Sequence, residues 1–447
     1  MAGAAWLFPF FPAAARAAAY VYYRVTYAGP RAPRRGPVLL VANHTNSLLD
    51  PVLVVAAARR PVRFLAKAPL FSDRKIGWVV KAAGAIPVYR RQDDPAEMTK
   101  NEDTFRAVHA ALGGGAAVGL FPEGLSHSEP SLAPLKTGAA RIALGAYPIA
   151  GHMFPIVPLG LVFREKAVFR SGVLVLGGPS VEWADLAGRG PDDAGAVREL
   201  TRRIADALRQ VTVNLERWAD SPLVECAVRV WEAAHGVPIA PAERVKRLTI
   251  TTDLLARIRR DRQPVWLELA DDVASHCHRL SRLGLRPADV TADVGVRRGL
   301  NWAVARIPAV TPLVAVLGLA GYLLYVVPYY LTGRVATMMR PIPDQVSTHK
   351  LLAGIPLYLA WVLALIAAAG LAWGVAAGAA VLLVAPVVGM LGLLVRERWR
   401  GAWQDARRFL LLRSRRDMVR QLADRQHDLA ARLDALYNHY TAGRDRG

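Results

Sequence analysis

The 447-residue sequence contains few cysteines and few acidic residues. Its two cysteines, Cys226 and Cys277, are too few for a disulfide framework or a cysteine-rich zinc module, and such a low number suits a reducing compartment. Asp and Glu total 36 against 57 Lys and Arg, which gives a formal net charge of +21. Such a basic chain suits a nucleic acid, an anionic membrane surface or a phosphorylated substrate. Hydrophobic residues make up 53% of the chain, which excludes a mainly disordered protein.

Charged residues are missing from two long apolar stretches towards the end of the chain. Residues 307–333 and 351–395 contain no Asp, Glu, Lys or Arg. A helix that spans a bilayer needs about 20 apolar residues, so the first stretch suffices for one crossing and the second for two. The alternative is very apolar core helices in a soluble domain, but such helices rarely run so long without charge. We therefore predict a membrane-embedded region over residues 301–395.

Prolines and flanking arginines bear on how this region crosses the membrane. The first stretch contains Pro308, Pro312 and Pro328. Because proline removes a backbone donor and kinks a helix, we predict a re-entrant hairpin there. Arginines flank the region, namely Arg297, Arg298 and Arg306 before it and Arg396, Arg398, Arg400, Arg407 and Arg408 after it. Basic flanks favour the cytoplasmic side, so a re-entrant segment followed by a two-helix hairpin would place both flanks and the active domain there.

The rest of the chain divides by composition into four segments. Residues 1–29 are apolar and lack the charged start of a secretory signal, because no Lys or Arg precedes Arg16. They predict an interfacial helix in the headgroup plane, with a helix packed on a soluble domain as the alternative. Residues 30–185 carry the strand signals, and 186–300 predict a helical subdomain of unknown role. Residues 396–447 predict a basic amphipathic tail, either on anionic lipid or as a solvated or coiled-coil helix.

Short apolar runs alternate with helical patterns between residues 30 and 185. The runs, rich in Val, Ile and Leu as buried strands are, cover Val38–Ala42, Arg63–Ala66, Ile86–Tyr89, Ala117–Phe121, Pro155–Val162 and Val173–Leu176. The helical patterns cover Leu48–Arg59, Lys75–Ala83, Glu97–Leu112 and Thr137–Ala146. This alternation predicts an α/β domain with a mostly parallel or mixed sheet and flanking helices.

A histidine and an aspartate follow the first of these predicted strands. Asn43 and His44 come directly after it, and Asp50 lies in the first turns of the next helix. Ligands collect at the carboxyl ends of strands in α/β sheets. A carboxylate bonded to one ring nitrogen of His44 would make the other nitrogen a general base. A loop or capping contact is the alternative for an isolated His–Asp pair.

Three further segments place charge after other strands. Arg90 ends a predicted strand, and a guanidinium binds phosphate bidentately. Glu123 and Gly124 lie in a turn after the next strand, where the carboxylate would hold a hydroxyl or Arg90 and the glycine would let a phosphate approach the backbone. Lys136 precedes a helix and would add positive charge. The alternatives are a surface arginine, an ordinary turn and a solvated lysine.

In order and content, these segments resemble the phospholipid and glycerol acyltransferase family, which includes glycerol-3-phosphate and lysophosphatidate acyltransferases. The matching residues are His44 and Asp50, Gly84 and Arg90, Phe121 to Gly124 with Ser126, and Val157 with Pro158. The resemblance covers residues 30–185. One departure is the spacing of the first motif, because five residues separate His44 from Asp50 where the family usually has four.

The resemblance implies direct acyl transfer to a phosphate-bearing alcohol, with His44 as the base and Asp50 orienting it. Acyl-CoA or acyl carrier protein would be the donor, and glycerol-3-phosphate, dihydroxyacetone phosphate or lysophosphatidate the acceptor. No cofactor or metal is expected. No Gly-x-Ser-x-Gly motif is present and neither cysteine lies near these motifs, so no acyl-enzyme is expected. The expected substrate-binding residues are Asn43, Arg90, Glu123, Gly124, Ser126 and Lys136.

Three other interpretations compete with this one. A non-catalytic membrane protein that binds lipids through the same fold would transfer no acyl group, and an acyltransferase for another lipid acceptor would use other substrates. A nucleic-acid binder is disfavoured, because the basic residues gather beside the apolar stretches and not on a nucleic-acid module. His276, Cys277 and His278 do not predict a metal site, since adjacent side chains on a helix diverge.

Overall fold

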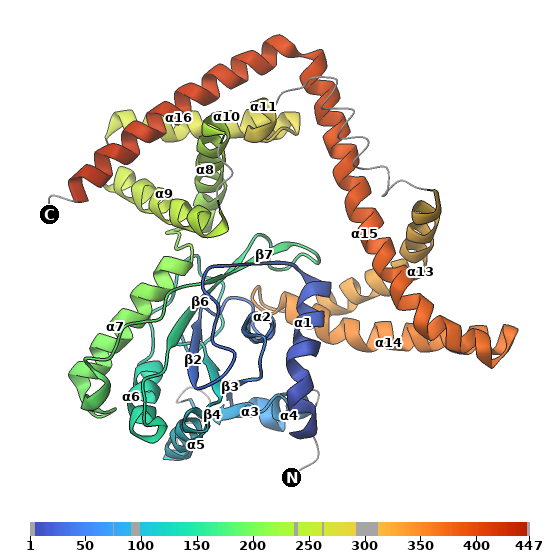
Figure 1. Ribbon diagram of the computed structural model, residues 1–447. Coiled ribbons are helices and arrows are strands. Elements are labelled where there is room, and N and C mark those ends of the chain that lie inside the picture. Colours follow the sequence, from blue (N-terminus) through green and yellow to red (C-terminus); the bar gives the residue numbers. More distant parts are fainter. Residues whose placement is uncertain are drawn as a thin grey trace. The chain divides into compact units, whose positions relative to one another are not determined.

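The computed structural model describes residues 5–74, 76–90, 99–236, 240–261, 263–291 and 312–444 (Figure 1). The chain divides into two compact units. The first comprises the chain up to Trp218 together with Ala240–Thr252 and Ile342–Thr348, and the second comprises the rest. The predicted basic flank at Arg297, Arg298 and Arg306 lies outside the described residues.

A mixed seven-stranded sheet forms the centre of the first unit, with the strand order β1-β7-β6-β2-β5-β3-β4. The strands are β1 (Arg24–Ala28), β2 (Val38–Ala42), β3 (Val62–Lys67), β4 (Ile86–Val88), β5 (Ala117–Leu120), β6 (Ile156–Phe163) and β7 (Gly172–Gly177). β6 and β7 are antiparallel, and the other neighbours are parallel. The six predicted strands and the mixed sheet are confirmed. β1 escaped prediction because its RVTYA sequence is short and starts with a charged residue.

Helices surround this sheet. They are η1 (Ala5–Phe10), α1 (Phe11–Tyr22), α2 (Leu49–Ala58), α3 (Pro69–Ser72), α4 (Gly77–Ala82), α5 (Asn101–Gly113), α6 (Gly138–Ala150), η3 (Ala187–Arg189) and α7 (Ala194–Val211). α7 packs against β6 and α6, and its apolar residues Leu200, Ile204 and Leu208 are fully buried in the core. The first unit therefore extends beyond residue 185, because the apolar stripe of α7 is covered by the sheet.

The N-terminal helix is also attached to this unit. α1 packs against α2 and buries Ala15, Ala19 and Tyr22, and the strand that follows it pairs with β7. For the N-terminal segment the structure thus shows a helix packed on the domain, which was the alternative to a helix in the headgroup plane. Exposed Phe10 and Tyr20 leave contact with a membrane as a prediction.

The second unit is helical. Its elements are η4 (Trp218–Asp220), α8 (Ser221–His235), part of α9 (Pro241–Asp261), α10 (Pro264–Leu283), α11 (Pro287–Val290), α13 (Pro312–Met338), α14 (Val346–Trp373), α15 (Val375–Ser414) and α16 (Arg416–Arg444). α16 packs against α8, α10 and α11, and it buries Leu422, Leu429 and Leu436. Protein therefore covers the apolar face of the tail, for which we expected lipid, with a solvated or coiled-coil helix as the alternative. An amphipathic pattern specifies an apolar partner and does not distinguish protein from lipid.

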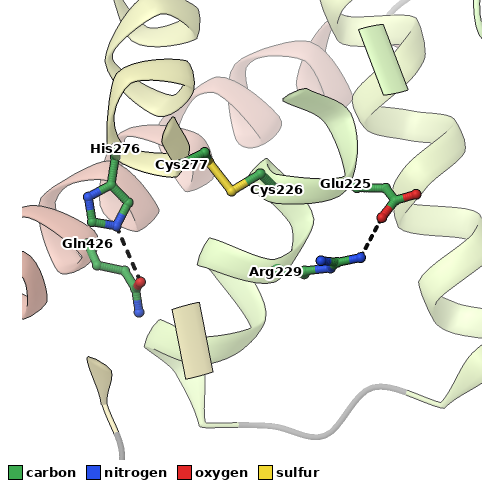
Figure 2. The surroundings of a disulfide bond; sticks show 6 residues. All are labelled: Glu225, Cys226, Arg229, His276, Cys277 and Gln426. Carbon is green, nitrogen blue, oxygen red and sulfur yellow. Dashed lines mark hydrogen bonds and ion pairs between the residues drawn. A yellow bond between two sulfur atoms is a disulfide. The ribbon is translucent and has the colours of Figure 1, made fainter. Parts of the chain in front are cut away.

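The two cysteines are joined in a disulfide that links α8 to α10. Figure 2 shows Cys226 bonded to Cys277, and the neighbouring His276 faces Gln426 of α16, with its Nε2 atom 3.4 Å from Gln426 Oε1. Close by on α8, Arg229 pairs with Glu225. A single bridge is no disulfide framework, but it differs from the free thiols that a reducing compartment suggested.

Among the described residues, three helices are long and apolar enough to cross a membrane, namely Ala315–Met338 within α13, then α14 and α15. The predicted re-entrant hairpin in the first stretch is wrong, because α13 is one continuous helix of 27 residues. Pro312 starts the helix, where a missing donor costs nothing, and only Pro328 lies inside it. Thr332 Oγ1 donates to the Pro328 carbonyl at 2.7 Å. Residues 307–311 of the predicted stretch lie outside the described residues.

Candidate active site

His44 and Asp50 form a hydrogen-bonded pair at the carboxyl end of β2. His44 Nδ1 lies 2.9 Å from Asp50 Oδ2, and Asp50, in the first turn of α2, is fully buried. A carboxylate that accepts the Nδ1 proton leaves Nε2 as the basic nitrogen. Nε2 has no hydrogen-bond partner among the described residues, and the His44 side chain is 19% exposed. The ring is thus placed to take a proton from a molecule outside the fold.

The loop between the two residues turns back on itself, so the longer spacing still brings them together. Ser47 has φ +46°, a left-handed conformation that is uncommon for a residue with a side chain. The amides of Leu49 and Asp50 donate to the carbonyls of Asn46 and Ser47 at 3.1 and 3.3 Å. The Asn46 amide also donates to Asp50 Oδ2 at 2.7 Å. The extra residue lies in this turn and does not separate the pair.

The turn after β5 supports the backbone of His44. The Glu123 carboxylate, 1% exposed, accepts from the His44 amide at 2.7 Å and from the Ala133 amide at 2.8 Å. His127 Nε2 bonds the same carboxylate, and it carries the ring proton because Nδ1 accepts from the Glu129 amide at 3.1 Å. These bonds assign Glu123 to holding the loop. Its binding of a substrate hydroxyl stays a prediction.

Three further contacts join the loop after β2 to the turn after β5. The rings of His44 and Phe121 stack with centroids 4.0 Å apart and planes inclined by 10°. Ser126 Oγ accepts from the Ser47 amide at 3.1 Å. The His127 amide donates to the His44 carbonyl at 3.1 Å. The first and third sequence motifs therefore form one rigid structure, and Ser126 acts within it. Substrate binding by Ser126 stays a prediction.

Two cationic side chains lie beside the same turn. Arg90, half-buried, donates from Nη1 to the Gly124 carbonyl at 3.1 Å. Gly124 has φ +77°, and a Cβ added there would lie 3.2 Å from Cγ of the exposed Lys136. A guanidinium and an ammonium next to a glycine turn form an arrangement that suits a phosphate. The structure thus brings Arg90, Gly124 and Lys136 together as the motifs predicted.

Asn43 links β2 to β6. It is 7% exposed, its Nδ2 donates to the Leu161 carbonyl at 3.1 Å, and its Oδ1 accepts from the Leu161 amide at 2.7 Å. Val157 and Pro158 lie in β6, in register with β2. The amide of Asn43 is therefore engaged with backbone, and substrate binding by Asn43 stays a prediction.

Lys166 is a half-buried cation that sequence reasoning missed, because no motif marks the segment after β6. Its Nζ donates to the Thr45 carbonyl at 3.1 Å and to Ser128 Oγ at 2.7 Å. Burial lowers the pKa of Lys166, while the charges of Asp344 and Asp50 act in the opposite direction. Lys166 thereby places a positive charge behind the His44 loop. Within the described part of the chain, no cluster of three or more His, Cys, Asp or Glu could hold a metal ion.

The mixed sheet and this site define an α/β domain in which a hydrogen-bonded histidine–aspartate pair and two cationic side chains lie beside the same turn. Residues 24–162 match the family model described as Acyltransferase, so this part of the chain is similar to that family.

Three curated relatives illustrate the range of similarity. Glycerol-3-phosphate O-acyltransferase 2 of Saccharomyces cerevisiae is 34% identical over 31% of this chain and 19% of its own length. The uncharacterized acyltransferase C1718.04 of Schizosaccharomyces pombe is 25% identical over 58% of this chain and 51% of its own length. The chloroplastic 1-acyl-sn-glycerol-3-phosphate acyltransferase LPAT1 of Arabidopsis thaliana is 30% identical over 24% and 28%. The chain therefore spans about half or less of each relative.

Proposed function

We propose that this protein is a membrane-bound O-acyltransferase of phospholipid synthesis. It moves a fatty acyl group from acyl-CoA or acyl carrier protein to the hydroxyl of glycerol-3-phosphate or lysophosphatidate. The observation that carries this proposal is the His44–Asp50 pair, 2.9 Å apart, with Arg90 and Lys136 at the neighbouring turn. The names of the relatives support the same two acceptors.

In the proposed mechanism the acceptor hydroxyl attacks the thioester carbonyl while His44 Nε2 takes its proton. The negative charge of Asp50 stabilises the imidazolium that forms. Collapse of the tetrahedral intermediate breaks the carbon–sulfur bond, and the imidazolium returns the proton to the departing thiolate. Arg90 and Lys136 bind the acceptor phosphate, so the hydroxyl is held near His44.

An assay of the purified full-length protein in detergent tests this proposal. Labelled acyl-CoA or acyl carrier protein is offered with glycerol-3-phosphate, dihydroxyacetone phosphate or lysophosphatidate. Wild type should acylate at least one acceptor, and His44→Ala should lose about 10³-fold or more of kcat while remaining folded. The matched control is His152→Ala, because His152 is exposed and lies outside the site. Near-normal turnover by His44→Ala would remove the mechanism, and an inactive wild type would favour the non-catalytic lipid binder.

Arg90 provides a test of acceptor binding. Because its guanidinium lies beside the glycine turn, Arg90→Ala should raise the acceptor KM about tenfold or more and leave the donor KM near wild type. Arg74→Ala is a suitable control, since Arg74 is an exposed arginine of the same unit. An unchanged acceptor KM would place the phosphate elsewhere.

Packing in the helical unit bears on the membrane arrangement. α16, which follows the apolar helices, packs on α8 and α10, which precede them. Arg432 and Arg425 of α16 pair with Asp272 of α10 at 2.7 and 3.1 Å. Segments that pack together lie on one side of a bilayer, so the number of crossings between them is even. Only two of the three candidate helices can then cross.

We propose that α14 and α15 cross as a hairpin and that α13 stays in one half of the bilayer. Ile342–Thr348, which follows α13 and reaches the first turn of α14, belongs to the acyltransferase unit, and no candidate span lies in the described residues before α13. Both ends of α13 are therefore on one side. α13 is also the least hydropathic of the three helices.

The contacts of α13 with α15 agree with this placement. A Cβ on Gly321 would lie 2.1 Å from the Val388 carbonyl, so the two backbones touch there. The Arg396 guanidinium lies 5.4 Å from the centre of the Tyr322 ring. These contacts fall where the charge-free part of α15 ends. The arginines that begin at Arg396 make the cytoplasmic side the favoured one for both units.

Labelling of introduced cysteines tests this topology in intact cells. A membrane-impermeant maleimide should label Trp373→Cys, at the exposed end of α14, from outside the cell. It should reach Asp417→Cys, at the start of α16, only after permeabilisation. The unsubstituted protein gives the background from Cys226 and Cys277. Labelling of both sites from outside would overturn the hairpin.

A further inference from the structure

The segment that joins α13 to α14, together with the first turn of α14, places three buried polar side chains in the acyltransferase unit. Ile342–Thr348 belongs to that unit although most of α13 and α14 belongs to the other. Its side chains Asp344, Ser347 and Thr348 are only 4%, 1% and 8% exposed. Connections ordinarily lie in solvent, so burial of three polar side chains indicates docking against polar partners.

Ser347 and Tyr23 form a hydrogen-bond network behind the catalytic loop. Ser347 Oγ donates to the Lys166 carbonyl at 2.5 Å. The Tyr23 hydroxyl lies 3.3 Å from Ser347 Oγ, bonds the same carbonyl, and accepts from Asn46 Nδ2 at 2.7 Å. Burial raises the pKa of Tyr23, so this hydroxyl keeps its proton and remains a donor. The network therefore ends on Asn46, which lies between His44 and Asp50.

Asn46 leads directly to the catalytic pair. Its amide donates to Asp50 Oδ2 at 2.7 Å, the same oxygen that lies 2.9 Å from His44 Nδ1. The other oxygen, Asp50 Oδ1, is buried and has no hydrogen-bond partner among the described residues. The orientation of the carboxylate therefore depends on Oδ2 and its two partners, so a shift of Asn46 would reach His44.

Each of the four residues after His44 and before Leu49 is held from a different part of the fold. The holding contacts are Lys166 Nζ to the Thr45 carbonyl, Asn46 Nδ2 to Tyr23, the Ser47 amide to Ser126, and the Leu48 amide to Thr348 Oγ1 at 3.2 Å. The left-handed φ of Ser47 costs energy, and the surrounding contacts must maintain it. The loop with the longer His–Asp spacing is thus held by hydrogen bonds from several parts of the fold, and one of them comes from the first turn of α14.

We propose that Ser347, Thr348 and Tyr23 are positioning residues for acyl transfer, because they hold the His44–Asp50 loop in its active shape. None of them touches the reacting atoms. Since Ser347 and Thr348 form the first turn of α14, a helix of bilayer-spanning length, the catalytic loop is tied to the membrane-embedded region. This inference rests on the proposed function.

The double variant Ser347→Ala, Thr348→Val in the full chain tests the inference, with Ser414→Ala, Thr337→Val as the matched control outside the network. The loss of two hydrogen bonds should lower kcat about tenfold, with the acceptor KM within about twofold of wild type.

The pH dependence of kcat gives a second readout. A loosened Asp50 carboxylate stabilises the imidazolium less, so the acid limb of the plot of kcat against pH should move to lower pH. Thr348→Ser, which keeps the hydroxyl, should restore much of kcat over Thr348→Val. A purely structural role would lower the amount of folded enzyme without moving the acid limb.

Hydrogen exchange supplies a readout that needs no activity. The amides of residues 46–48 should exchange faster in the double variant, and those of the control variant should not change. Tyr23→Phe, which removes one hydroxyl from a packed ring, should act in the same direction if the double variant does not fold. Wild-type exchange, kcat and acid limb in either folded variant would overturn the inference and leave the proposed function intact. An inactive wild type would overturn the proposed acyl transfer. Hydrogen exchange of the amides of residues 46–48 would then still test whether these contacts hold the loop.

Discussion

Replacement of Glu123 by glutamine separates two roles for the buried carboxylate. Its oxygens accept from the amides of His44 and Ala133 and from the ring N–H of His127. A glutamine has one acceptor oxygen and one NH₂, so either orientation of its amide makes at least one of these N–H groups face another donor. The substitution therefore disturbs the support of His44 whichever way the amide lies.

The expected cost follows from the number and kind of hydrogen bonds. A hydrogen bond to a charged group contributes about 1.5–3 kcal/mol, and the bonds that remain lose the added strength of a charged acceptor. We expect Glu123→Gln to lower the free energy of unfolding by about 3 kcal/mol. For a domain of this size that corresponds to a fall in Tm of roughly 6–12 °C. Turnover should fall with it, since the backbone of His44 loses its anchor.

Thermal unfolding in detergent and steady-state kinetics check this expectation. Glu129→Gln is the matched control, because Glu129 is exposed and should show wild-type values. If Glu123 instead bound the acceptor hydroxyl, the substitution would raise the acceptor KM and leave Tm unchanged. A variant with wild-type Tm would therefore refute the role that the hydrogen bonds assign to Glu123.

Three other predictions concern stability. Gly160→Ala would bring a Cβ within 1.8 Å of a backbone oxygen at the end of α7, so it should cost about 3 kcal/mol in thermal unfolding, whereas Gly188→Ala, with open space around it, should not. The Cys226–Cys277 bridge closes a separation of 51 residues, so its reduction should lower the denaturant stability of the helical unit by about 4 kcal/mol, and unchanged midpoints would contradict this. Hydrogen bonds from the arginines three and four positions later lower the pKa of Glu199 to about 2. Its stabilisation should be complete above pH 4.5 and lost as the pH falls through about 2, and Glu199→Gln should remove this part of the pH dependence.

Sequence reasoning recovered the elements whose cause is local. Each buried strand is a short run of Val, Ile and Leu, and the runs at 38–42 and 117–121 correspond to β2 and β5. His44 and Asp50 are close in sequence, at the end of a strand and the first turn of a helix, so their contact could be anticipated without the rest of the fold.

Partners distant in sequence could not be anticipated in the same way. Tyr23 contacts Asn46 of the catalytic loop from 23 positions away in the sequence. Ser347 contacts Tyr23 from 324 positions away. Nothing in the local sequence marks either residue, because a single hydroxyl predicts no partner. The amphipathic tail was ambiguous in the same way, since its apolar face requires an apolar neighbour and the sequence does not specify whether that neighbour is protein or lipid.

The sequence by itself determined the α/β class, the bilayer-length apolar helices and the residues that gather at the strand ends. These properties follow from hydrophobic period, charge-free length and short-range spacing, which depend on neighbours along the chain. Only the tertiary structure decided that Glu123 is a support, that α16 is covered by α8 and α10, and that the first turn of α14 holds the loop of His44. The physical reason is that a hydrogen bond or an apolar contact is satisfied by any suitable group within reach, and folding alone determines which group that is.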